Sequence, residues 1–221
     1  MRTPLASVLG AATSLISNRN LYSPHQTDEL LATIREEAER LDRFVGNLLD
    51  MSRLEAGVVG AKPETTDVGE LVQISLKRLA RRLSKHKIII DLPSNLPLVS
   101  TDPLLMEQAL VNLLDNAAKY SPVDSQIRIA AHPFAQIVLV TVEDEGLGIA
   151  PDEMSHIFDK FYRAKAADQR IAGTGLGLAV ARGFVEAFGG KLDASNRTDR
   201  SGAILTIALP IAAEGTVPLG T

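Results

Sequence analysis

Apolar residues in the first quarter of the chain recur at the spacing of α-helices. Over residues 1–17 they predict one helix, because they stand at positions 5, 8, 9, 12, 15 and 16, on one side of a helical wheel. The next eight residues, NRNLYSPH, have the composition of a turn. Over residues 26–56 the apolar positions advance by alternating steps of three and four, which is typical of the contact stripe of a helical bundle. That stripe comprises Leu30, Ile34, Ala38, Leu41, Val45, Leu48 and Ser52.

Two helices of unequal length cannot bury such stripes against each other alone. We therefore expect residues 1–57 to be a dimerisation hairpin, two copies of which make a four-helix bundle in a homodimer. The alternative is that the hairpin lies on the following domain of the same chain. Residues 58–66 are expected to be a linker, because the segment GVVGAKPETT at 57–66 holds two glycines and a proline without periodicity.

Helices and strands are mixed after residue 66, and the strands come largely as neighbouring pairs. Helices are expected at 68–84, 102–120 and 175–190, and extended segments at 87–92, 97–101, 127–132, 137–144, 191–196 and 203–210. The strand at 137–144 is apolar on both faces, which predicts a central position in its sheet. The chain as a whole is therefore predicted to be α+β. The helical hairpin precedes an α/β sandwich over residues 67–212, with helices on one face of a mixed sheet, and 213–221 is expected to be a flexible tail.

Composition narrows the classes of function. The chain has 221 residues, 45% of them hydrophobic, and a formal charge of −4, enough for one large domain or two modest ones. It has no cysteine, which excludes disulfides and thiolate metal sites. The apolar runs are too short for a membrane span, no signal peptide is recognised, and the evenly spread charge does not favour nucleic acid. These features predict a soluble protein of a reducing compartment.

The helix expected at 102–120 carries two distinct faces. Asp102 is expected to cap it, with Pro103 at its first position. Its apolar face comprises Met106, Ala109, Leu110, Leu113, Leu114 and Ala117. A polar stripe beside that face comprises Gln108, Asn112, Asn116 and Lys119, and Glu107 and Asp115 are expected to face solvent. The stripe is either partly buried and satisfied by backbone or water, or a site for a hard cation and phosphate.

Two glycine clusters add candidate chemistry. Asp144, Gly146 and Gly148 follow the central strand, where a carboxylate can accept a hydrogen bond from an exocyclic amine; the same pattern also occurs in ordinary turns. Gly173, Gly175 and Gly177 open a helix, whose N-terminal amides favour an anion. The second cluster lacks the third glycine of the Rossmann fingerprint, and the chain has no P-loop.

A long polar segment, residues 150–176, separates the glycine clusters. Phe158 and Phe161 are expected to anchor a short helical turn to the body of the domain, and Arg163 to project toward the ligand. The alternative is a surface loop held by apolar contacts. Long irregular loops in compact domains are more often functional, and this one is interpreted as a lid.

Four of these motifs in this order resemble sensor histidine kinases. The segments 112–120, 144–149, the segment with Phe158 and Phe161, and 173–178 resemble their asparagine box, first glycine box, phenylalanine box and second glycine box. The wider superfamily joins gyrase, Hsp90-type, kinase and MutL ATP-binding proteins. The resemblance covers residues 1–212, and four ordered motifs are far more specific than any one of them.

This resemblance implies a Bergerat-type fold that binds ATP and Mg²⁺. Asn116 and Asn112 would hold Mg²⁺, while Lys119 and Arg163 would contact phosphates. Tyr120 would stack on adenine and Asp144 would bind its amine. The other implied ATP-binding residues are Gly146, Gly148, Ile149, Phe158, Phe161, Gly173, Thr174, Gly175, Leu176, Gly177 and Leu178.

The N-terminal RTPL resembles the end of the phospho-acceptor box of these kinases. The acceptor histidine would lie two residues before Met1, so this chain does not contain it. The four histidines present, at 25, 86, 132 and 156, are interpreted as surface residues. Thr3 matches the threonine implicated in dephosphorylating the response regulator. The stretch RTPLASVLGAATSL resembles KdpD-type sensor kinases, which respond to potassium.

The resemblance also bears on the reaction. ATP-hydrolysing relatives have a glutamate four residues before the magnesium-binding asparagine, and in this chain that position is Asn112. An amide cannot take a proton from water, so phosphoryl transfer to a protein side chain is expected rather than hydrolysis. The whole protein would phosphorylate a histidine and pass the group to an aspartate of a response-regulator receiver domain. This chain would bind Mg²⁺-ATP without phosphorylating itself, as the cytoplasmic part of a membrane-anchored protein.

Two other functions stay open. One is a nucleotide-binding scaffold, or a regulator phosphatase acting through Thr3, without autokinase activity. The other is a serine kinase or ATPase of the same superfamily, of the anti-sigma type. The hairpin and the RTPL stretch argue against the second, because such proteins lack that hairpin.

Overall fold

A computed structural model of the chain describes residues 2–18, 21–56, 62–163 and 174–213, except for the side chains of residues 2–4. Its backbone divides into two compact units, Met1–Ser52 and Arg53–Thr221. Among the helices of the described residues, none combines the length and apolar content that a membrane crossing requires.

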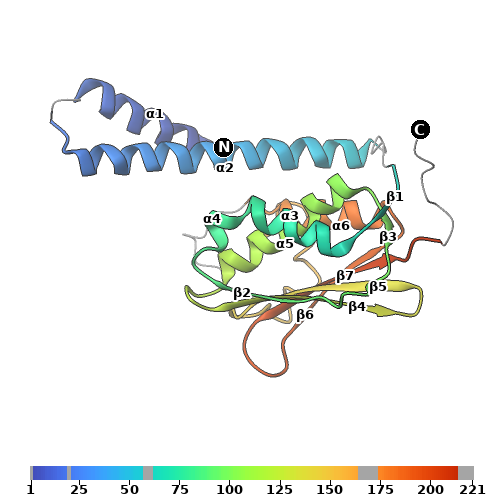
Figure 1. Ribbon diagram of the computed structural model, residues 1–221. Helices are drawn as coiled ribbons and strands as arrows, with labels where there is room; N and C mark the ends of the chain where they lie inside the picture. The colour runs from blue at the N-terminus through green and yellow to red at the C-terminus, as the bar shows by residue number, and fades with distance from the viewer. Residues whose placement is uncertain (1, 19–20, 57–61, 164–173, 214–221) are drawn as a thin grey trace. The chain divides into compact units, whose positions relative to one another are not determined.

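The first unit is a hairpin of helices α1 (Arg2–Ser17) and α2 (Pro24–Glu55), which run side by side (Figure 1). A reciprocal pair of hydrogen bonds marks the start of α2. The Gln26 amide donates to Ser23 Oγ at 3.3 Å, and the Ser23 amide donates to Gln26 Oε1 at 2.9 Å. This is a capping box, and Pro24 occupies the first helical position, where its missing N–H costs nothing. The helix therefore begins two residues earlier than the periodicity predicted.

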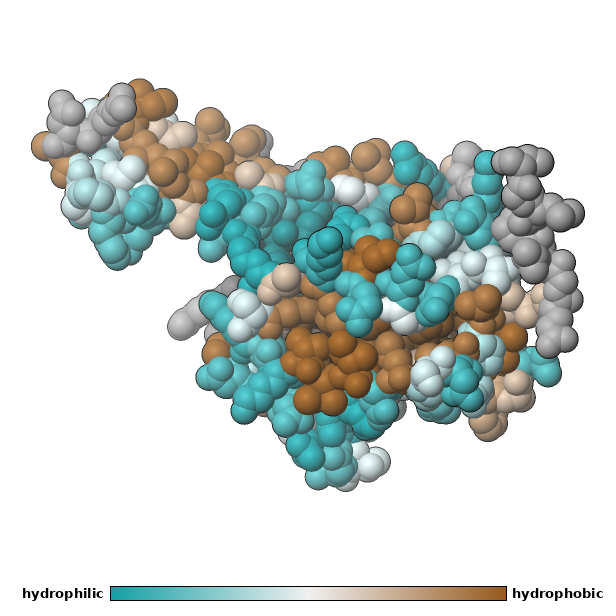
Figure 2. Space-filling model, viewed as in Figure 1, coloured by the Kyte–Doolittle hydropathy of each residue, from teal (hydrophilic) through white to brown (hydrophobic). Residues whose placement is uncertain are grey.

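The hairpin leaves its apolar stripe open. No described residue of α2 is buried, and in α1 Ala11 alone is buried among the described side chains. Val45 and Leu48 of the predicted stripe are 50% and 41% exposed. Figure 2 shows apolar side chains at the surface of the hairpin. Exposure of this kind is typical of a surface that a partner covers.

The second unit is built on a five-stranded mixed sheet in the order β2-β4-β5-β7-β6. Strand β2 pairs parallel with β4, and the other pairs are antiparallel. The strands are β2 (Lys87–Asp91), β4 (Gln126–Phe134), β5 (Ile137–Glu143), β6 (Lys191–Asn196) and β7 (Ala203–Pro210). As predicted, β5 lies in the middle of the sheet, and β6 and β7 form the final hairpin.

Helices cover one face of this sheet (Figure 1). They are α3 (Val68–Arg78), α4 (Ala80–Leu83), α5 (Pro103–Tyr120) and α6 (Gly177–Glu186). Alternate residues of β4, β5 and β7 point toward the helices and are buried. The fully buried side chains Met106, Leu113, Leu114, Ile127, Ile129, Leu176, Phe184, Ile207 and Leu209 form the core between the two layers. The predicted α+β architecture, with helices on one face of a mixed sheet, is confirmed.

Two details of the second unit differ from the prediction. The end of the expected linker, Glu64–Thr66, is a strand, β1, which pairs antiparallel with β3 (Val99–Thr101). A three-residue strand without apolar alternation gives no local signal, since only its partner identifies it. The helix expected at 68–84 is interrupted at Leu79, whose ψ of 9° leaves the helical region. The bend leaves both Leu79 and Leu83 buried.

Candidate functional site

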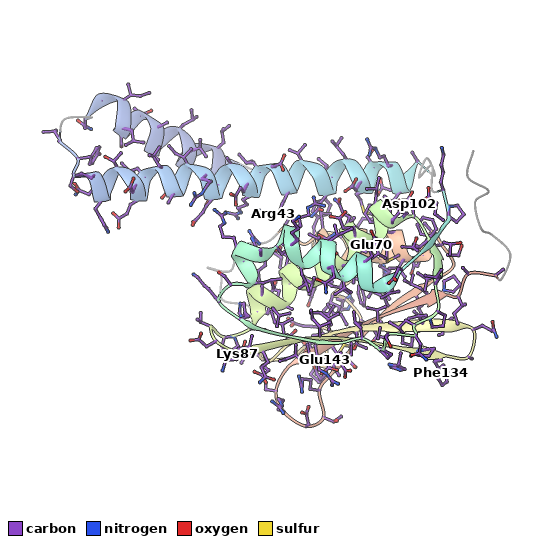
Figure 3. The ribbon with its side chains drawn as sticks, viewed as in Figure 1. Arg43, Glu70, Lys87, Asp102, Phe134 and Glu143 are labelled. Atoms are coloured by element: carbon purple, nitrogen blue, oxygen red, sulfur yellow. The ribbon has the colours of Figure 1, made fainter. Side chains whose placement is uncertain are left out.

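The predicted site residues lie mainly at one end of the sheet, where β5 ends and β7 begins. In Figure 3 this is the end that Lys87 marks, and Phe134 marks the opposite end. Three segments meet there, namely the C-terminal end of α5, the loop 144–149 and the start of α6. The site is therefore built from parts of the chain that are well separated in the sequence.

Asp144 is a buried carboxylate at the end of β5, only 7% exposed. Its Oδ1 accepts hydrogen bonds from the amides of Gly146, at 2.8 Å, and Ala203, at 3.2 Å. Burial raises the pKa of Asp144, and the two amides and the nearby Arg197 oppose that rise. Both hydrogen bonds use Oδ1, so among the described residues Oδ2 is left to accept one from a ligand.

Gly146 brings this loop against the end of α5. A Cβ at this position would lie 2.6 Å from the carbonyl oxygen of Tyr120 and 3.0 Å from Asp144 Oδ1. Real Cβ atoms do not approach backbone so closely, so a side chain here would separate the loop from the helix. The glycine of the predicted motif thus explains how Asp144 and Tyr120 come together.

The predicted polar stripe of α5 borders the start of α6. A Cβ on Gly177, the first residue of α6, would lie 3.4 Å from Asn112 Oδ1. The Nδ2 of Asn112 is buried and has no hydrogen-bond partner among the described residues. A buried amide without a partner is costly, which is a sign that a ligand completes its hydrogen bonding. Asn116 lies one turn further along the same face and is partly exposed.

Asp115 contradicts the prediction that it faces solvent. It is 7% exposed and joins two cations, Lys119 at 2.5 Å through Oδ2 and Arg82 of α4 through Oδ1. Glu107 was also predicted to face solvent, but it is only partly exposed and pairs with Arg78 at 3.1 Å. Periodicity alone could not reveal that α3 and α4 place arginines beside this side of α5. The ammonium of Lys119 is thereby held at the end of the polar stripe.

Tyr120 and Arg163 lie close enough to interact. Burial raises the pKa of Tyr120, Arg163 opposes that rise and Asp115 adds to it. Tyr120 is 39% exposed, so part of the residue is accessible to a ligand. Two residues that are distant in the sequence are thus gathered at the end of α5.

The phenylalanine segment is anchored by one aromatic side chain instead of two. Phe158 is buried, with the guanidinium of Arg182 5.3 Å from its ring centre, as the anchoring prediction required. Phe161 is 61% exposed, and its φ of 64° is unusual for a bulky residue. The prediction that both rings anchor the segment is therefore wrong for Phe161. The positive φ carries its side chain away from the body of the domain.

Backbone contacts join Phe161 to the second glycine cluster. Its amide donates to the carbonyl of Gly175 at 2.8 Å. Gly175 has a φ of 70°, and a Cβ there would lie 2.5 Å from the carbonyl carbon of Phe161. Glycine is therefore required by both conformation and space.

The start of α6 has the properties of an anion site. The residue at its N-cap, Leu176, is fully buried, and no described side chain caps the first turn. The first amides of α6, at Gly177 and Leu178, therefore face the site without a capping side chain. Thr174 Oγ1 accepts from the Leu176 amide at 3.3 Å and shapes the turn before the helix.

The residues fit a magnesium ion held mainly by a nucleotide. Among the described residues, no group of three or more acidic or histidine side chains could hold a metal alone. The site instead offers the neutral carboxamides of Asn112 and Asn116. Magnesium bound in this way takes most of its ligands from phosphate oxygens and water.

Sequence reasoning missed Asn196, Ser201 and Ala203, which all contact the loop 144–149. They belong to the SNRTDRSGA stretch, which runs from the end of β6 to the start of β7 and whose composition signals only a turn. Gly173 and the side chain of Thr3, both predicted to be functional, lie outside the described residues.

Comparison with known families identifies two regions. Residues 101–213 match the family described as histidine kinase-, DNA gyrase B-, and HSP90-like ATPase, and residues 1–57 match the His Kinase A (phospho-acceptor) domain. The sensor protein KdpD of Clostridium acetobutylicum is 38% identical over 212 residues, which are 95% of this chain and 23% of that protein. The chain thus spans about a quarter of the length of the KdpD proteins that it matches.

Solved structures agree with these matches. The histidine kinase AdeS of Acinetobacter baumannii is similar with a TM-score of 0.74 and 28% identity, covering 96% of this chain and 97% of that one. Full-length ShkA, solved in complex with AMPPNP, gives a TM-score of 0.70 and 26% identity, over 96% of this chain and 44% of that one. The chain therefore belongs to the histidine kinase-, DNA gyrase B- and HSP90-like ATPases, and its two matched regions together are those of a histidine kinase catalytic core.

Proposed function

We propose that this chain is the ATP-binding and dimerisation core of a two-component sensor histidine kinase. In the whole protein it would transfer the γ-phosphoryl group of Mg²⁺-ATP to a histidine, and then to an aspartate of a response-regulator receiver domain. One observation carries this proposal. The buried Asp144, the carboxamide stripe of α5 and the uncapped start of α6 meet at one end of the sheet.

Asp144 is proposed to recognise the adenine base. Its Oδ2 accepts a hydrogen bond from the exocyclic amine, while Oδ1 keeps its bonds to the Gly146 and Ala203 amides. The ring of Tyr120 stacks on the base beside it. Because the carboxylate is buried, this hydrogen bond competes little with water and contributes strongly to selectivity for adenine.

The phosphates are proposed to lie between α5 and α6. The first amides of α6 and the cations Lys119 and Arg163 neutralise their charge. Asn116 and Asn112 would hold Mg²⁺, which when bound would supply positive charge to offset the charge that develops in phosphoryl transfer. The unpaired Nδ2 of Asn112 supports this role, because turning the amide presents its oxygen to a cation.

Phosphoryl transfer to a protein group is favoured over hydrolysis. The side chain one turn before Asn116 is the carboxamide of Asn112, which cannot act as a general base toward water. Among the described residues, no acidic side chain takes that place on the polar stripe of α5. The reaction is then mostly positioning and charge neutralisation, and the acceptor supplies the nucleophile.

The hairpin of α1 and α2 is proposed to be a homodimerisation surface. Its exposed apolar residues include Leu9, Leu31, Val45, Leu48 and Leu49, each at least 41% exposed. Two hairpins that pack as a four-helix bundle would cover them. A receiver domain would dock on this bundle, and the whole protein would be membrane-anchored and respond to potassium.

Phosphoryl transfer within a mixed dimer tests the proposal. This chain is mixed with a longer, otherwise identical partner that carries the acceptor histidine but has Asn116→Ala, which disables its own ATP site. Label from γ-labelled ATP is expected on the histidine of the partner, in an acid-labile and base-stable linkage. That result would show that the ATP site of this chain is active in phosphoryl transfer.

The mixed dimer holds its intact ATP site and its acceptor histidine in different subunits. If transfer runs only within one subunit, this dimer stays unlabelled, so a second measurement is needed. The longer chain with both the histidine and an intact Asn116 should be labelled in either geometry. Label on that chain alone would assign transfer to a single subunit. The absence of label on both, while dimers are demonstrably present, would reject the kinase function.

A further inference from the structure

The connection between β6 and β7, residues 197–202, contacts the loop that carries Asp144. The contacts come from both ends of the connection and from its middle. The Asp144 amide donates to the Ala203 carbonyl at 3.0 Å, and the Ala203 amide donates back to Asp144 Oδ1 at 3.2 Å. The position of this carboxylate thus depends on the start of β7 as well as on its own strand.

Asn196, the last residue of β6, holds the far end of the loop. Its Oδ1 accepts from the Ile149 amide at 2.7 Å, and its Nδ2 donates to the Ile149 carbonyl at 2.7 Å. A single carboxamide therefore satisfies both backbone groups of one residue, as a neighbouring strand would. It also lies beside Gly148, where a Cβ would be 2.8 Å from Asn196 Oδ1.

Ser201 holds the middle of the loop. Its Oγ donates to the Gly146 carbonyl at 2.7 Å. Gly146 is the residue that packs on the Tyr120 backbone, so this hydrogen bond fixes the part of the loop that contacts the end of α5. Gly202 follows with a φ of 142°, and a Cβ there would lie 2.0 Å from the Asp144 carbonyl oxygen. The connection and the loop are thus in direct backbone contact.

Ion pairs reinforce this arrangement. Arg197 pairs with Glu143 at 3.4 Å and with Asp199 at 2.9 Å, and Glu143 is labelled in Figure 3 at the end of β5. Arg200 bridges Asp199, at 2.9 Å, and Glu145, at 2.8 Å. The Arg197–Glu143 pair is largely shielded, with side chains 11% and 15% exposed. The pairs of Arg200 are more exposed and contribute little individually, but the network links the connection to both residues next to Asp144.

We infer that Asn196 and Ser201 are positioning residues, which fix the loop 144–149 so that Asp144 and Tyr120 select adenine. The inference rests on the proposed nucleotide function and goes beyond it, because neither residue belongs to the motifs that indicate the ATP site. Neither side chain is assigned a contact with the nucleotide. Each acts through loop backbone, Asn196 at Ile149 and Ser201 at Gly146.

The test measures binding of ADP and GDP by calorimetry for the native chain, Asn196→Ala and Ser201→Ala. Loss of loop hydrogen bonds is expected to weaken ADP binding roughly tenfold, because each is worth up to about tenfold in an equilibrium constant. GDP, which has a carbonyl where adenine has its 6-amino group, should bind weakly and almost equally to all three. Ser201→Thr keeps the hydroxyl and should restore ADP binding. Asp193→Ala, in β6 away from the loop, is the control.

Amide hydrogen exchange supplies a readout that does not depend on nucleotide. In Asn196→Ala the Ile149 amide should exchange faster, while amides in the centre of β5 keep their protection. A merely structural role would instead lower the free energy of unfolding and speed exchange throughout the sheet. Unfolding by denaturant, measured on each variant, separates the two cases.

The outcomes are distinguishable. Weaker ADP binding with faster exchange confined to 144–149 supports the inference. Native-like ADP binding in both Asn196→Ala and Ser201→Ala overturns the inference and leaves the proposed function intact. Faster exchange that spreads through the whole sheet overturns the inference in the same way. If the native chain binds no adenine nucleotide, the proposed function fails and the inference fails with it.

Discussion

Asp115 and Asp144 are both buried carboxylates, yet their surroundings suit different tasks. Asp115 has two cationic partners, Arg82 and Lys119, so its charge is compensated within the protein. Among the described residues, Asp144 accepts hydrogen bonds from backbone amides alone, and burial raises its pKa. Asp115, whose charge is compensated, holds Arg82 and Lys119 in place. Asp144 has an oxygen that is left to accept a hydrogen bond from a ligand.

The raised pKa of Asp144 predicts how stability depends on pH. The folded state holds the proton of this carboxyl more tightly than the unfolded state does, so unfolding releases it. The contribution of Asp144 to stability is therefore most favourable at low pH, and it declines as pH rises from the ordinary value of 3.8 through the raised pKa. Asp144→Asn cannot titrate, and its free energy of unfolding should rise relative to the native chain over that window. Parallel stability curves from about pH 3.5 to 7 would contradict the prediction.

Removing the charge of Asp115 should destabilise the second unit. In Asp115→Asn the cations of Arg82 and Lys119 lose their common partner, and both are only partly exposed, at 30% and 25%. We expect the free energy of unfolding to fall by about 1–2 kcal/mol, below the cost for a fully buried pair because solvent screens these groups.

Asp193→Ala is the matched control for Asp115→Asn. It breaks an Asp–Lys pair whose side chains are 57% and 72% exposed, and it should change stability by less than about 0.5 kcal/mol. Denaturant unfolding of the two variants checks both expectations. Equal effects would mean that Asp115 is no more important than a surface charge.

At the scale of elements, α5 joins the core to the site. Its apolar face supplies Met106, Leu110, Leu113 and Leu114 to the core, and its polar stripe supplies the site residues. Its end is fixed by the contact between Tyr120 and Gly146. The geometry of the site therefore depends on this helix forming in one register.

Substitutions at Asp102, the N-cap of α5, measure how much the start of this helix contributes to stability. Asp102 Oδ1 accepts from the amides of Leu104, at 3.0 Å, and Leu105, at 3.2 Å. Asp102→Ala should lower the free energy of unfolding by about 1 kcal/mol. Asp102→Asn keeps an acceptor oxygen and should cost only a few tenths of that. Circular dichroism during denaturation measures both, and equal losses in the two variants would contradict the capping role.

Elements with strong local periodicity were predictable, and pairings between distant segments were not. The apolar face of α5 and the apolar pattern of β5 predicted these elements correctly, because the spacing of apolar residues within each segment shows which side chains are buried. Strand β1, the inward position of Asp115 and the exposure of Phe161 depend on partners elsewhere in the chain. Asn196 belongs with them, since its role is visible only when Ile149 is placed beside it. The glycine motifs predicted where segments approach closely, because Gly146 and Gly175 have no room for a side chain.

At the scale of the whole molecule, the two units differ in how completely they bury their apolar residues. The second unit has a closed core between sheet and helices, whereas the first has almost no buried side chain among its described residues. A hairpin of this kind is not expected to be stable alone. Its apolar stripe therefore accounts for the proposed homodimer.

A charge in the stripe should prevent dimerisation. Leu48→Glu places a carboxylate at a position that is 41% exposed in the single chain and would be covered in a bundle. Sedimentation equilibrium should show a dimer for the native chain and mainly monomer for this variant. Arg35→Glu, at an exposed position outside the stripe, is the control and should remain dimeric. A monomeric native chain would contradict the four-helix bundle.

The central claim is that α5, the loop 144–149 and the start of α6 form one site for Mg²⁺-ATP. Calorimetric titration with a non-hydrolysable ATP analogue, with and without Mg²⁺, tests it most directly when the native chain is compared with Asn116→Ala. We expect the native chain to bind the analogue more tightly with Mg²⁺ than without it, and the variant to lose that difference. No binding by the native chain, or equal dependence on Mg²⁺ in both proteins, would contradict it.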